Sequence, residues 1–129
     1  MASIFTQIIH RELPAYIVAE DDSNMAILDI NPLVEGHVLV FPKIEVDKIY
    51  DLAPEDYASL MQFSQQLSLK IQKGYPDKRV ASAVVGLEVP HAHVHLVPIT
   101  HVAELNFTKE RPSFTPNDFL RCLERLKQV

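Results

Sequence analysis

The sequence has 129 residues, of which 47% are hydrophobic and 22% charged, a composition typical of an ordinary globular protein with one core. Its net charge of −5 argues against a nucleic-acid-binding protein and against a protein held on an anionic membrane. A single cysteine excludes an internal disulfide, the first residues lack the pattern of a signal peptide, and no apolar run could span a bilayer. We therefore expect one domain over residues 1–129, located in the cytoplasm, with no nucleic-acid or membrane partner.

The first third of the chain predicts a helix, a hairpin and a third strand. Apolar residues at positions 4, 5, 8 and 9 predict a helix over 3–12, which Ser3 would cap. Apolar runs at 16–20 and 25–30 flank a polar turn and predict a β-hairpin. Residues 36–42 predict a further strand, which His37 opens. Taken alone, His37 is more often a structural histidine than a catalytic one, and Asp29 at a strand end is usually a turn residue.

A long helix is predicted from Pro54 to about Lys73, with Gly74 as the residue that ends it. Its predicted core stripe consists of Tyr57, Leu60, Met61, Leu67 and Ile71. Phe63 and Leu69 fall off that stripe, which suits either a subunit interface or simple partial burial.

The last part of the chain predicts two more strands and a final helix. Strands over 79–85 and 91–98 are five residues apart, a spacing that favours an antiparallel hairpin. The connection 99–113 has no clear period, and connections of that length tend to be functional or mobile. Residues 115–118 then carry the capping pattern of a helix, whose apolar face would hold Phe119, Leu120, Leu123 and Leu126. The resulting fold class is α+β, an antiparallel sheet of about five strands with helices packed on it.

Three histidines, His91, His93 and His95, alternate with apolar residues in the last predicted strand. Because side chains two apart in a strand share a face, the three imidazoles are expected to form one row. A row of this kind suits either metal binding or nucleophilic attack on phosphorus. The metal reading is weaker, because three ligands on a straight strand converge poorly and no carboxylate follows them closely. For attack on phosphorus, one ring needs its second nitrogen held by a backbone carbonyl, while flanking rings bind the phosphate oxygens.

Residues 91–97 resemble the His-φ-His-φ-His-φ-φ motif of the histidine-triad (HIT) superfamily of nucleotide hydrolases and transferases. The segments 3–15, 28–32 and 36–43 resemble the N-terminal segment and two strands of the same superfamily. The resemblance covers about residues 3–98, while residues 99–129 match no segment that we can assign.

The resemblance implies roles for the four histidines. His93 would attack the α-phosphorus to give a nucleotidyl-histidine intermediate, and His95 would contact the phosphate. His91 and His37 would complete the imidazole network. The third histidine favours a hydrolase over a transferase. The resemblance implies no cofactor, no metal, and a homodimer that joins two five-stranded sheets.

The resemblance also implies a purine nucleotide, or a nucleotide derivative, as the partner. The nucleotide-binding residues would be Asp29 at the ribose, Phe5, Ile8, Ile27 and Ile30 at the base, and Gly86 and Glu88 near the phosphate. The two main substrate candidates are phosphoramidates and dinucleoside polyphosphates.

Two departures from the superfamily keep other functions open. Residues 80–86 lack the asparagine that often grips the phosphates, and Leu87 stands where glutamine is common. The cysteines of zinc-binding members are replaced by Ser3 and Thr6, so no structural zinc is expected. A nucleotide-binding regulatory module with little activity and a zinc-dependent hydrolase are the alternatives.

Overall fold

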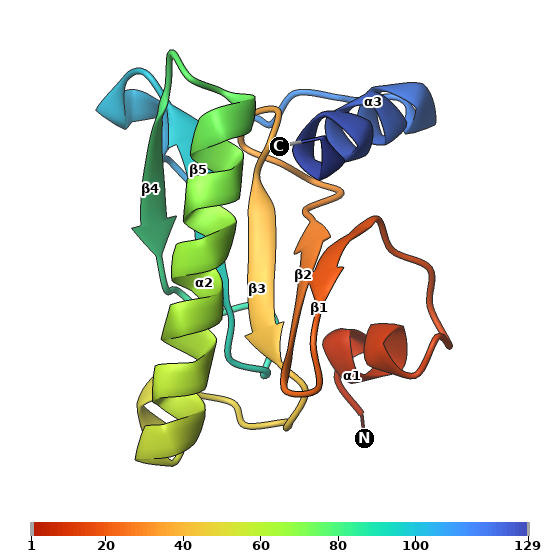
Figure 1. Ribbon diagram of the computed structural model, residues 1–129, viewed down its shortest axis with the longest axis vertical. Helices are drawn as coiled ribbons and strands as arrows, with labels where there is room; N and C mark the ends of the chain where they lie inside the picture. The colour runs from red at the N-terminus through yellow and green to blue at the C-terminus, as the bar shows by residue number, and fades with distance from the viewer. Residues whose placement is uncertain (1, 129) are drawn as a thin grey trace.

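The structure is a computed structural model that describes residues 2–128 (Figure 1). No helix in this described part of the chain is long and apolar enough to cross a membrane. The helices are α1 (Ile4–Ile9), α2 (Pro54–Gly74) and α3 (Pro116–Lys127), with short 3-10 helices η1 (Ile49–Asp51) and η2 (Val102–Glu104). The strands are β1 (Ile17–Glu20), β2 (Asn24–Leu28), β3 (Val38–Pro42), β4 (Arg79–Ala83) and β5 (Val94–Ile99).

The five strands form one sheet in the order β1-β2-β3-β5-β4, and every neighbouring pair is antiparallel. The predicted five-stranded antiparallel sheet is therefore confirmed. Ile27 of β2 is opposite Leu39 of β3, and Leu39 is opposite His95 of β5. Because directly opposite residues share a face, these three side chains form a row across the centre of the sheet.

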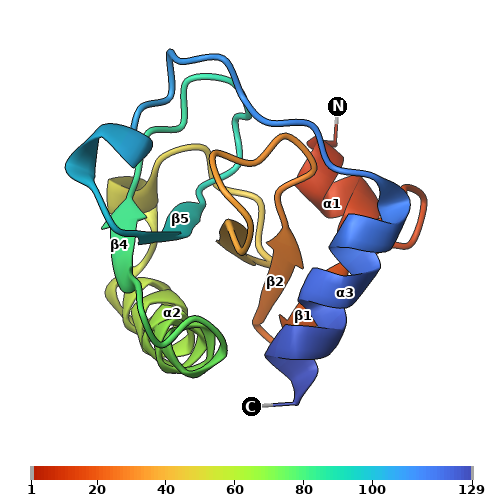
Figure 2. The same cartoon turned by 90° about the horizontal axis from the view of Figure 1, so that it is seen from above.

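The two faces of the sheet have different coverings. Helix α2 packs on one face (Figures 1 and 2), where it meets the residues that alternate with that central row. These buried residues are Ala26, Leu28, Val38, Val40, Val94 and Leu96. On the other face, Met25, Ile27, Leu39 and Phe41 pack with Phe5 and Ile8 of α1. The segments 84–93 and 105–115 pass on the side of the sheet away from α2 (Figure 2).

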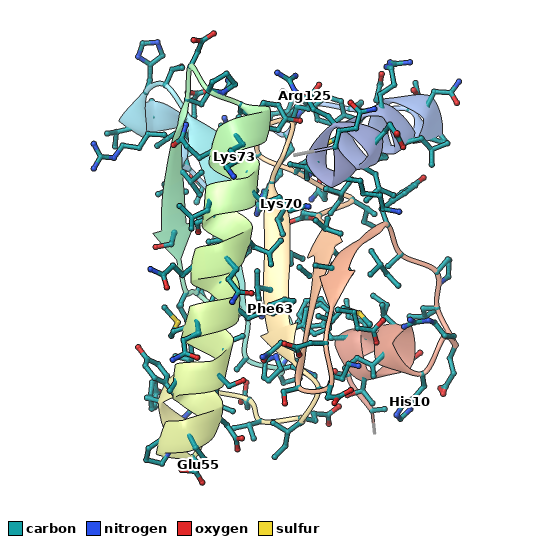
Figure 3. All side chains as sticks on the ribbon, viewed as in Figure 1. His10, Glu55, Phe63, Lys70, Lys73 and Arg125 are labelled. Atoms are coloured by element: carbon teal, nitrogen blue, oxygen red, sulfur yellow. The ribbon has the colours of Figure 1, made fainter. Side chains whose placement is uncertain are left out.

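The predicted division of α2 into a core stripe and a second apolar surface is wrong in part. Phe63, in the middle of α2 (Figure 3), is buried in the core, whereas Tyr57 is 44% exposed. Leu69 is 61% exposed and lies off the core side as predicted. Since Phe63 is occupied within the chain, only Leu69 remains of the surface that suggested a subunit interface, and the homodimer stays a prediction.

The helix ends show how α2 and α3 meet. Gly74 is the last residue of α2 and has no left-handed backbone, so it does not end the helix in the predicted way. A Cβ atom at Gly74 would lie 3.3 Å from Leu126 Cδ2, and glycine thus lets α3 approach. The predicted caps by Ser3 in α1 and by Thr115 in α3 are confirmed. Leu120 was placed on the buried face of α3 but is half exposed.

Candidate active site

The histidine segment is only partly a strand. Strand β5 begins at Val94, so His91 and His93 precede it, and the prediction of one strand over 91–98 is wrong at its start. The partner strand β4 ends at Ala83, opposite His95, and Ala92 donates its N–H to the carbonyl oxygen of Val46 at 2.7 Å. Without a sheet neighbour, this part of the chain has no reason to keep the period of a strand. The connection between β4 and β5 therefore spans 84–93, longer than the predicted five residues.

The rings of His93 and His95 are direct neighbours, and the Phe5 ring packs edge-on against both His91 and His93. The rings of His93 and His95 are 5.0 Å apart between centroids. The ring of His91 packs edge-on against Phe5 and Phe41 at 5.6 and 5.7 Å. His93 and His95 face the same space, and His91 lies beside the aromatic cluster under α1.

A cavity of about 410 Å³ opens over the sheet face that α2 leaves free, a volume in the usual range for a small-molecule site. Its lining includes every predicted nucleotide-binding residue, namely Asp29, Phe5, Ile8, Ile27, Ile30, Gly86 and Glu88. His93 and His95 line it too, whereas His91 and His37 are buried behind it. The structure thus brings the predicted binding residues together, and two of the four histidines, His93 and His95, line the cavity with them.

The hydrogen bond of His93 fixes the nitrogen that can react. Its Nδ1 lies 2.7 Å from the carbonyl oxygen of His91. A carbonyl oxygen only accepts, so Nδ1 carries the proton and donates it. The lone pair of Nε2 is then free in a side chain that lines the cavity. This is the arrangement that a nucleophilic imidazole requires.

Both ring nitrogens of His91 are occupied by other groups. Its Nε2 donates to the carbonyl oxygen of Pro42 at 2.7 Å, and its Nδ1 accepts from Ser3 Oγ at 2.7 Å. Burial also lowers the pKa of His91, which keeps the ring neutral. Neither ring nitrogen of His91 is therefore free to bind a ligand in this structure. His91 acts through its backbone, because its carbonyl oxygen orients His93.

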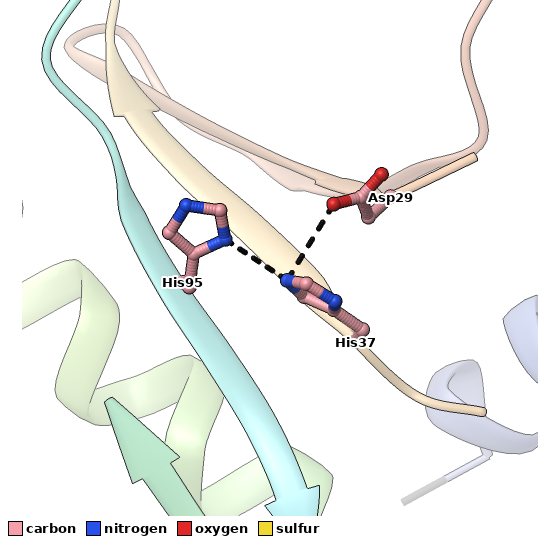
Figure 4. Close-up of side chains that lie close together, drawn as sticks. All are labelled: Asp29, His37 and His95. Carbon is pink, nitrogen blue, oxygen red and sulfur yellow. Dashed lines mark hydrogen bonds and ion pairs between the residues drawn. The ribbon is translucent and has the colours of Figure 1, made fainter. Parts of the chain in front are cut away.

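His37 and His95 form a directed chain of hydrogen bonds (Figure 4). The backbone N–H of Leu33 donates to His37 Nδ1 at 3.0 Å, so the proton of the neutral His37 ring is on Nε2. That Nε2 lies 3.0 Å from His95 Nδ1 and donates to it. The proton of His95 is consequently on its own Nε2, where it is available to a ligand in the cavity.

Burial keeps both rings of this chain neutral. It is the main cause that lowers the pKa of His37 to about 3 and the pKa of His95 to about 4. At neutral pH each ring then has one donor and one acceptor, and the chain runs in a single direction from Leu33 to the cavity.

Gly36 explains how His37 comes so close to His95. Its φ is +91°, and a Cβ atom there would lie 2.9 Å from both Pro98 Cγ and Tyr75 Cε2. Only glycine adopts this backbone without strain and without a clash. The start of β3 can therefore lie against the end of β5, with His37 beside His95.

Asp29 follows β2 and combines a turn role with a place in the cavity. One carboxylate oxygen accepts from the N–H of Asn31 at 2.8 Å, and the other lies 3.5 Å from His37 Nε2. Burial raises the pKa of this carboxyl group. Asp29 thus offers an acceptor next to the histidine chain.

Asp29, His37 and His95 also form a group whose ligand atoms lie within 4.8 Å of one another, which is close enough to surround a metal ion. The hydrogen bonds do not fit this role. Since Leu33 uses the lone pair of His37 Nδ1, the Nε2 atom holds the proton and has no lone pair for a metal. We therefore assign these residues to a hydrogen-bonded chain.

The connection 99–113 contributes cavity-lining residues that were not predicted from the sequence. Phe107, Thr108 and Arg111 line the cavity. The ring of Phe107 packs edge-on against His95 at 4.7 Å, and Arg111 donates from Nη1 to the carbonyl oxygen of Asn31 at 2.6 Å. The length of the connection indicated a functional segment, but nothing in its pattern indicated these residues.

The chain is similar in sequence to several known proteins. The chain is 34% identical to an uncharacterized HIT-like protein of Borreliella burgdorferi over 102 residues, 74% of this chain and 73% of that protein. It is 33% identical to adenosine 5'-monophosphoramidase HNT1 of Saccharomyces cerevisiae over 98 residues, 75% of this chain. It covers 62% of that yeast protein, less than two thirds of its length.

The fold is likewise similar to a solved structure. A hypothetical histidine triad nucleotide-binding protein from Sulfolobus tokodaii superposes with a TM-score of 0.84 at 26% identity, over 97% of this chain and 89% of that chain. The family model described as HIT domain matches residues 10–102, which include both the Gly-His strand and the histidine triad. The chain therefore belongs to the HIT domain family.

Proposed function

We propose that the protein is a nucleotide hydrolase that cleaves a bond at the α-phosphate of a nucleoside 5'-monophosphate derivative. The observation that carries this proposal is a pair of ring nitrogens in the cavity, of which one has a free lone pair and the other carries a proton. His93 offers a lone pair on Nε2, and His95 offers an N–H donor from a ring 5.0 Å away. A nucleophile beside a hydrogen-bond donor is the combination that phosphoryl transfer needs.

The reaction would proceed in two steps. His93 Nε2 attacks the α-phosphorus and forms a P–N bond, while the leaving group departs with the bonding electron pair and takes up a proton from solvent, to which the attacking water of the second step returns one. Water then attacks the same phosphorus, releases His93 and gives the nucleoside monophosphate. In both steps the Nε2–H of His95 donates to a non-bridging oxygen, where negative charge develops.

The cavity supports a nucleoside as the other part of the substrate. The carboxylate of Asp29 is placed to accept hydrogen bonds from ribose hydroxyls. Phe5, Ile8 and Ile27 give an apolar surface for a purine base at the α1 side of the cavity. Ile30 is largely exposed at the rim of the cavity, where a base could cover it.

An amine is the leaving group that the cavity favours, so we propose a phosphoramidate as the substrate and a dinucleoside polyphosphate as the second candidate. The connection 84–93 contains no lysine or arginine. It contributes the carboxylate of Glu88 to the cavity, which would repel a polyphosphate leaving group and attract an ammonium. The similarity to a yeast adenosine 5'-monophosphoramidase supports the same choice.

The test is turnover of a fluorogenic adenosine 5'-phosphoramidate by the wild type, His93→Ala and His10→Ala. His10 is an exposed histidine at the end of α1 (Figure 3) and serves as the matched control. We expect His93→Ala to lower kcat by several orders of magnitude while AMP still binds, and His10→Ala to keep full activity. Rapid quench should trap an acid-labile nucleotide adduct on a peptide that contains His93.

Other outcomes would support the alternatives. Nucleotide binding without turnover in the wild type would indicate a regulatory module and refute the hydrolase. Loss of activity on chelation and its return with zinc would refute the metal-free mechanism. Near-normal turnover by His93→Ala would show that the nucleophile is assigned to the wrong residue.

A further inference from the structure

The charges that line the cavity do not match an anionic ligand. Asp29 and Glu88 contribute two carboxylates. The histidine that donates toward the ligand, His95, is neutral, because burial lowers its pKa to about 4. A nucleotide brings at least one negative charge next to these groups, and its binding needs a compensating cation. Among the residues that line the cavity, Arg111 is the only arginine or lysine.

The contacts of Arg111 place it at the corner of the cavity where the phosphate would lie. Its Nη1 donates to the carbonyl oxygen of Asn31, two residues after Asp29, at 2.6 Å. Its guanidinium carbon lies 5.8 Å from the centroid of the Phe107 ring, and that ring packs against His95 at 4.7 Å. Asn31 thus connects Arg111 to Asp29, the proposed ribose acceptor. Phe107 connects it to His95, the proposed phosphate donor.

These contacts do not use all the N–H donors of the Arg111 guanidinium. Besides the bond to Asn31, it makes one long contact at 3.4 Å from Nη2 to the carbonyl oxygen of Phe107. A guanidinium has five N–H donors, so the remaining donors can bind a phosphate oxygen. After burial and a neighbouring imidazole, the charge of Arg111 is a further cause that lowers the pKa of both His37 and His95, which shows that its field reaches the histidine chain.

We propose that Arg111 is a substrate-binding residue, whose guanidinium pairs with the phosphate group that faces His93 and His95. This inference rests on the proposed nucleotide-binding function of the cavity. It makes the connection 99–113 part of the site and supplies the positive charge that the connection 84–93 lacks. The alternative role for Arg111 is structural, to hold the connection 99–113 against Asn31. The two roles predict different ligand dependence.

Calorimetric titration with AMP and with adenosine separates the two roles. We expect Arg111→Gln to weaken AMP binding at least tenfold and adenosine binding less than twofold, because adenosine has no phosphate. Arg111→Lys should fall between the wild type and Arg111→Gln, since lysine keeps the charge but loses the planar fork. Lys109→Gln is the matched control, because it removes the same charge from the same connection at a residue outside the cavity lining. It should bind both ligands as the wild type does.

The salt dependence of binding gives a second readout. AMP binding by the wild type should weaken more than adenosine binding as NaCl rises, and this difference should shrink in Arg111→Gln. Equal weakening of AMP and adenosine by Arg111→Gln would mean that Arg111 only fastens the connection, and this would overturn the proposal. Unchanged AMP affinity in Arg111→Gln would overturn it too. Because these are binding measurements, they are independent of turnover, whose absence would refute the hydrolase alone.

Discussion

Acid should destabilise this protein through the neutral histidine chain, well above the pH at which carboxylates titrate. In the unfolded chain a histidine has a pKa near 6.5. In the folded chain, chiefly through burial, the pKa of His37 is lowered to about 3 and the pKa of His95 to about 4. Between pH 7 and pH 5 the unfolded state therefore takes up protons that the folded state does not. The free energy of unfolding must fall as pH falls, with full stability present only above the unfolded pKa.

The size of the effect follows from the two pKa values of each group. From pH 7 to pH 5, protonation of one unfolded histidine at about 6.5 favours unfolding by about 2 kcal/mol, and a folded pKa of about 4 or lower offsets almost none of it. His37 and His95 together thus cost about 4 kcal/mol, a large part of the 5–15 kcal/mol of a typical domain. His91, whose pKa burial also lowers, acts in the same direction. Asp29 acts in the opposite direction, since burial raises its pKa.

Urea unfolding of the wild type and of His95→Gln at pH 7, 6 and 5 measures this effect. The wild type should lose about 4 kcal/mol over the interval. His95→Gln should lose about 2 kcal/mol less over the same interval, whatever its stability at pH 7, because it has one histidine fewer to protonate on unfolding. Equal stability of the wild type at pH 7 and pH 5 would refute the neutral chain, as would an undiminished pH dependence in His95→Gln.

Two further substitutions test how the site is held and what it binds. Ser3→Ala removes both the cap of α1 and the partner of His91 Nδ1, so the unfolding free energy should fall by about 1 kcal/mol. Its kcat should fall about tenfold with little change in KM, since misplaced catalytic groups affect the chemical step. Full activity in Ser3→Ala, or no recovery of activity in Ser3→Thr, would show that Ser3 does not position His91. Asp29→Ala should weaken AMP by about 1.5–3 kcal/mol more than 2',3'-dideoxy-AMP, because only AMP has ribose hydroxyls to lose a charged acceptor. Calorimetry that finds both ligands weakened alike would make Asp29 a turn residue only.

The fold was largely predictable because apolar runs indicate the strands and capping residues indicate where the helices begin. The error in α2 has a geometric cause. At about 100° per residue, Tyr57 and Phe63 project about 60° to either side of Leu60. The periodicity therefore predicts burial equally well for both residues. The position of the helix decides between them. Tyr57 is in the first turn of α2, and this end of the helix extends past the strands (Figure 1), whereas Phe63 lies in the middle of the helix (Figure 3) and is buried.

The histidines of the site and their expected tasks followed from the motif and the resemblance, but the hydrogen bonds that orient the rings did not. Those hydrogen bonds involve three backbone groups, the N–H of Leu33 and the carbonyl oxygens of Pro42 and His91. Every residue carries a carbonyl oxygen and almost every residue an N–H, so no side-chain pattern marks these partners. The alternation of the motif predicted only that the three imidazoles share one face of a strand. The backbone partners leave one ring with a free Nε2 lone pair, one ring with an Nε2–H donor, and two buried rings whose nitrogens are both bonded within the protein.

Arg111 and Phe107 were beyond prediction for a different reason, because their contacts are long-range. The bond from Arg111 joins residues 80 positions apart, and it forms in a connection without periodic structure. Both residues also lie beyond residue 102, where the match to the HIT domain ends. The histidine chain lies within the matched part, so the similarity to the family supports the proposed chemical step and not the choice of substrate. If Arg111 balances the charge of the phosphate, the choice of substrate depends on a segment outside that match, and relatives with another segment there can share the chemistry and differ in substrate.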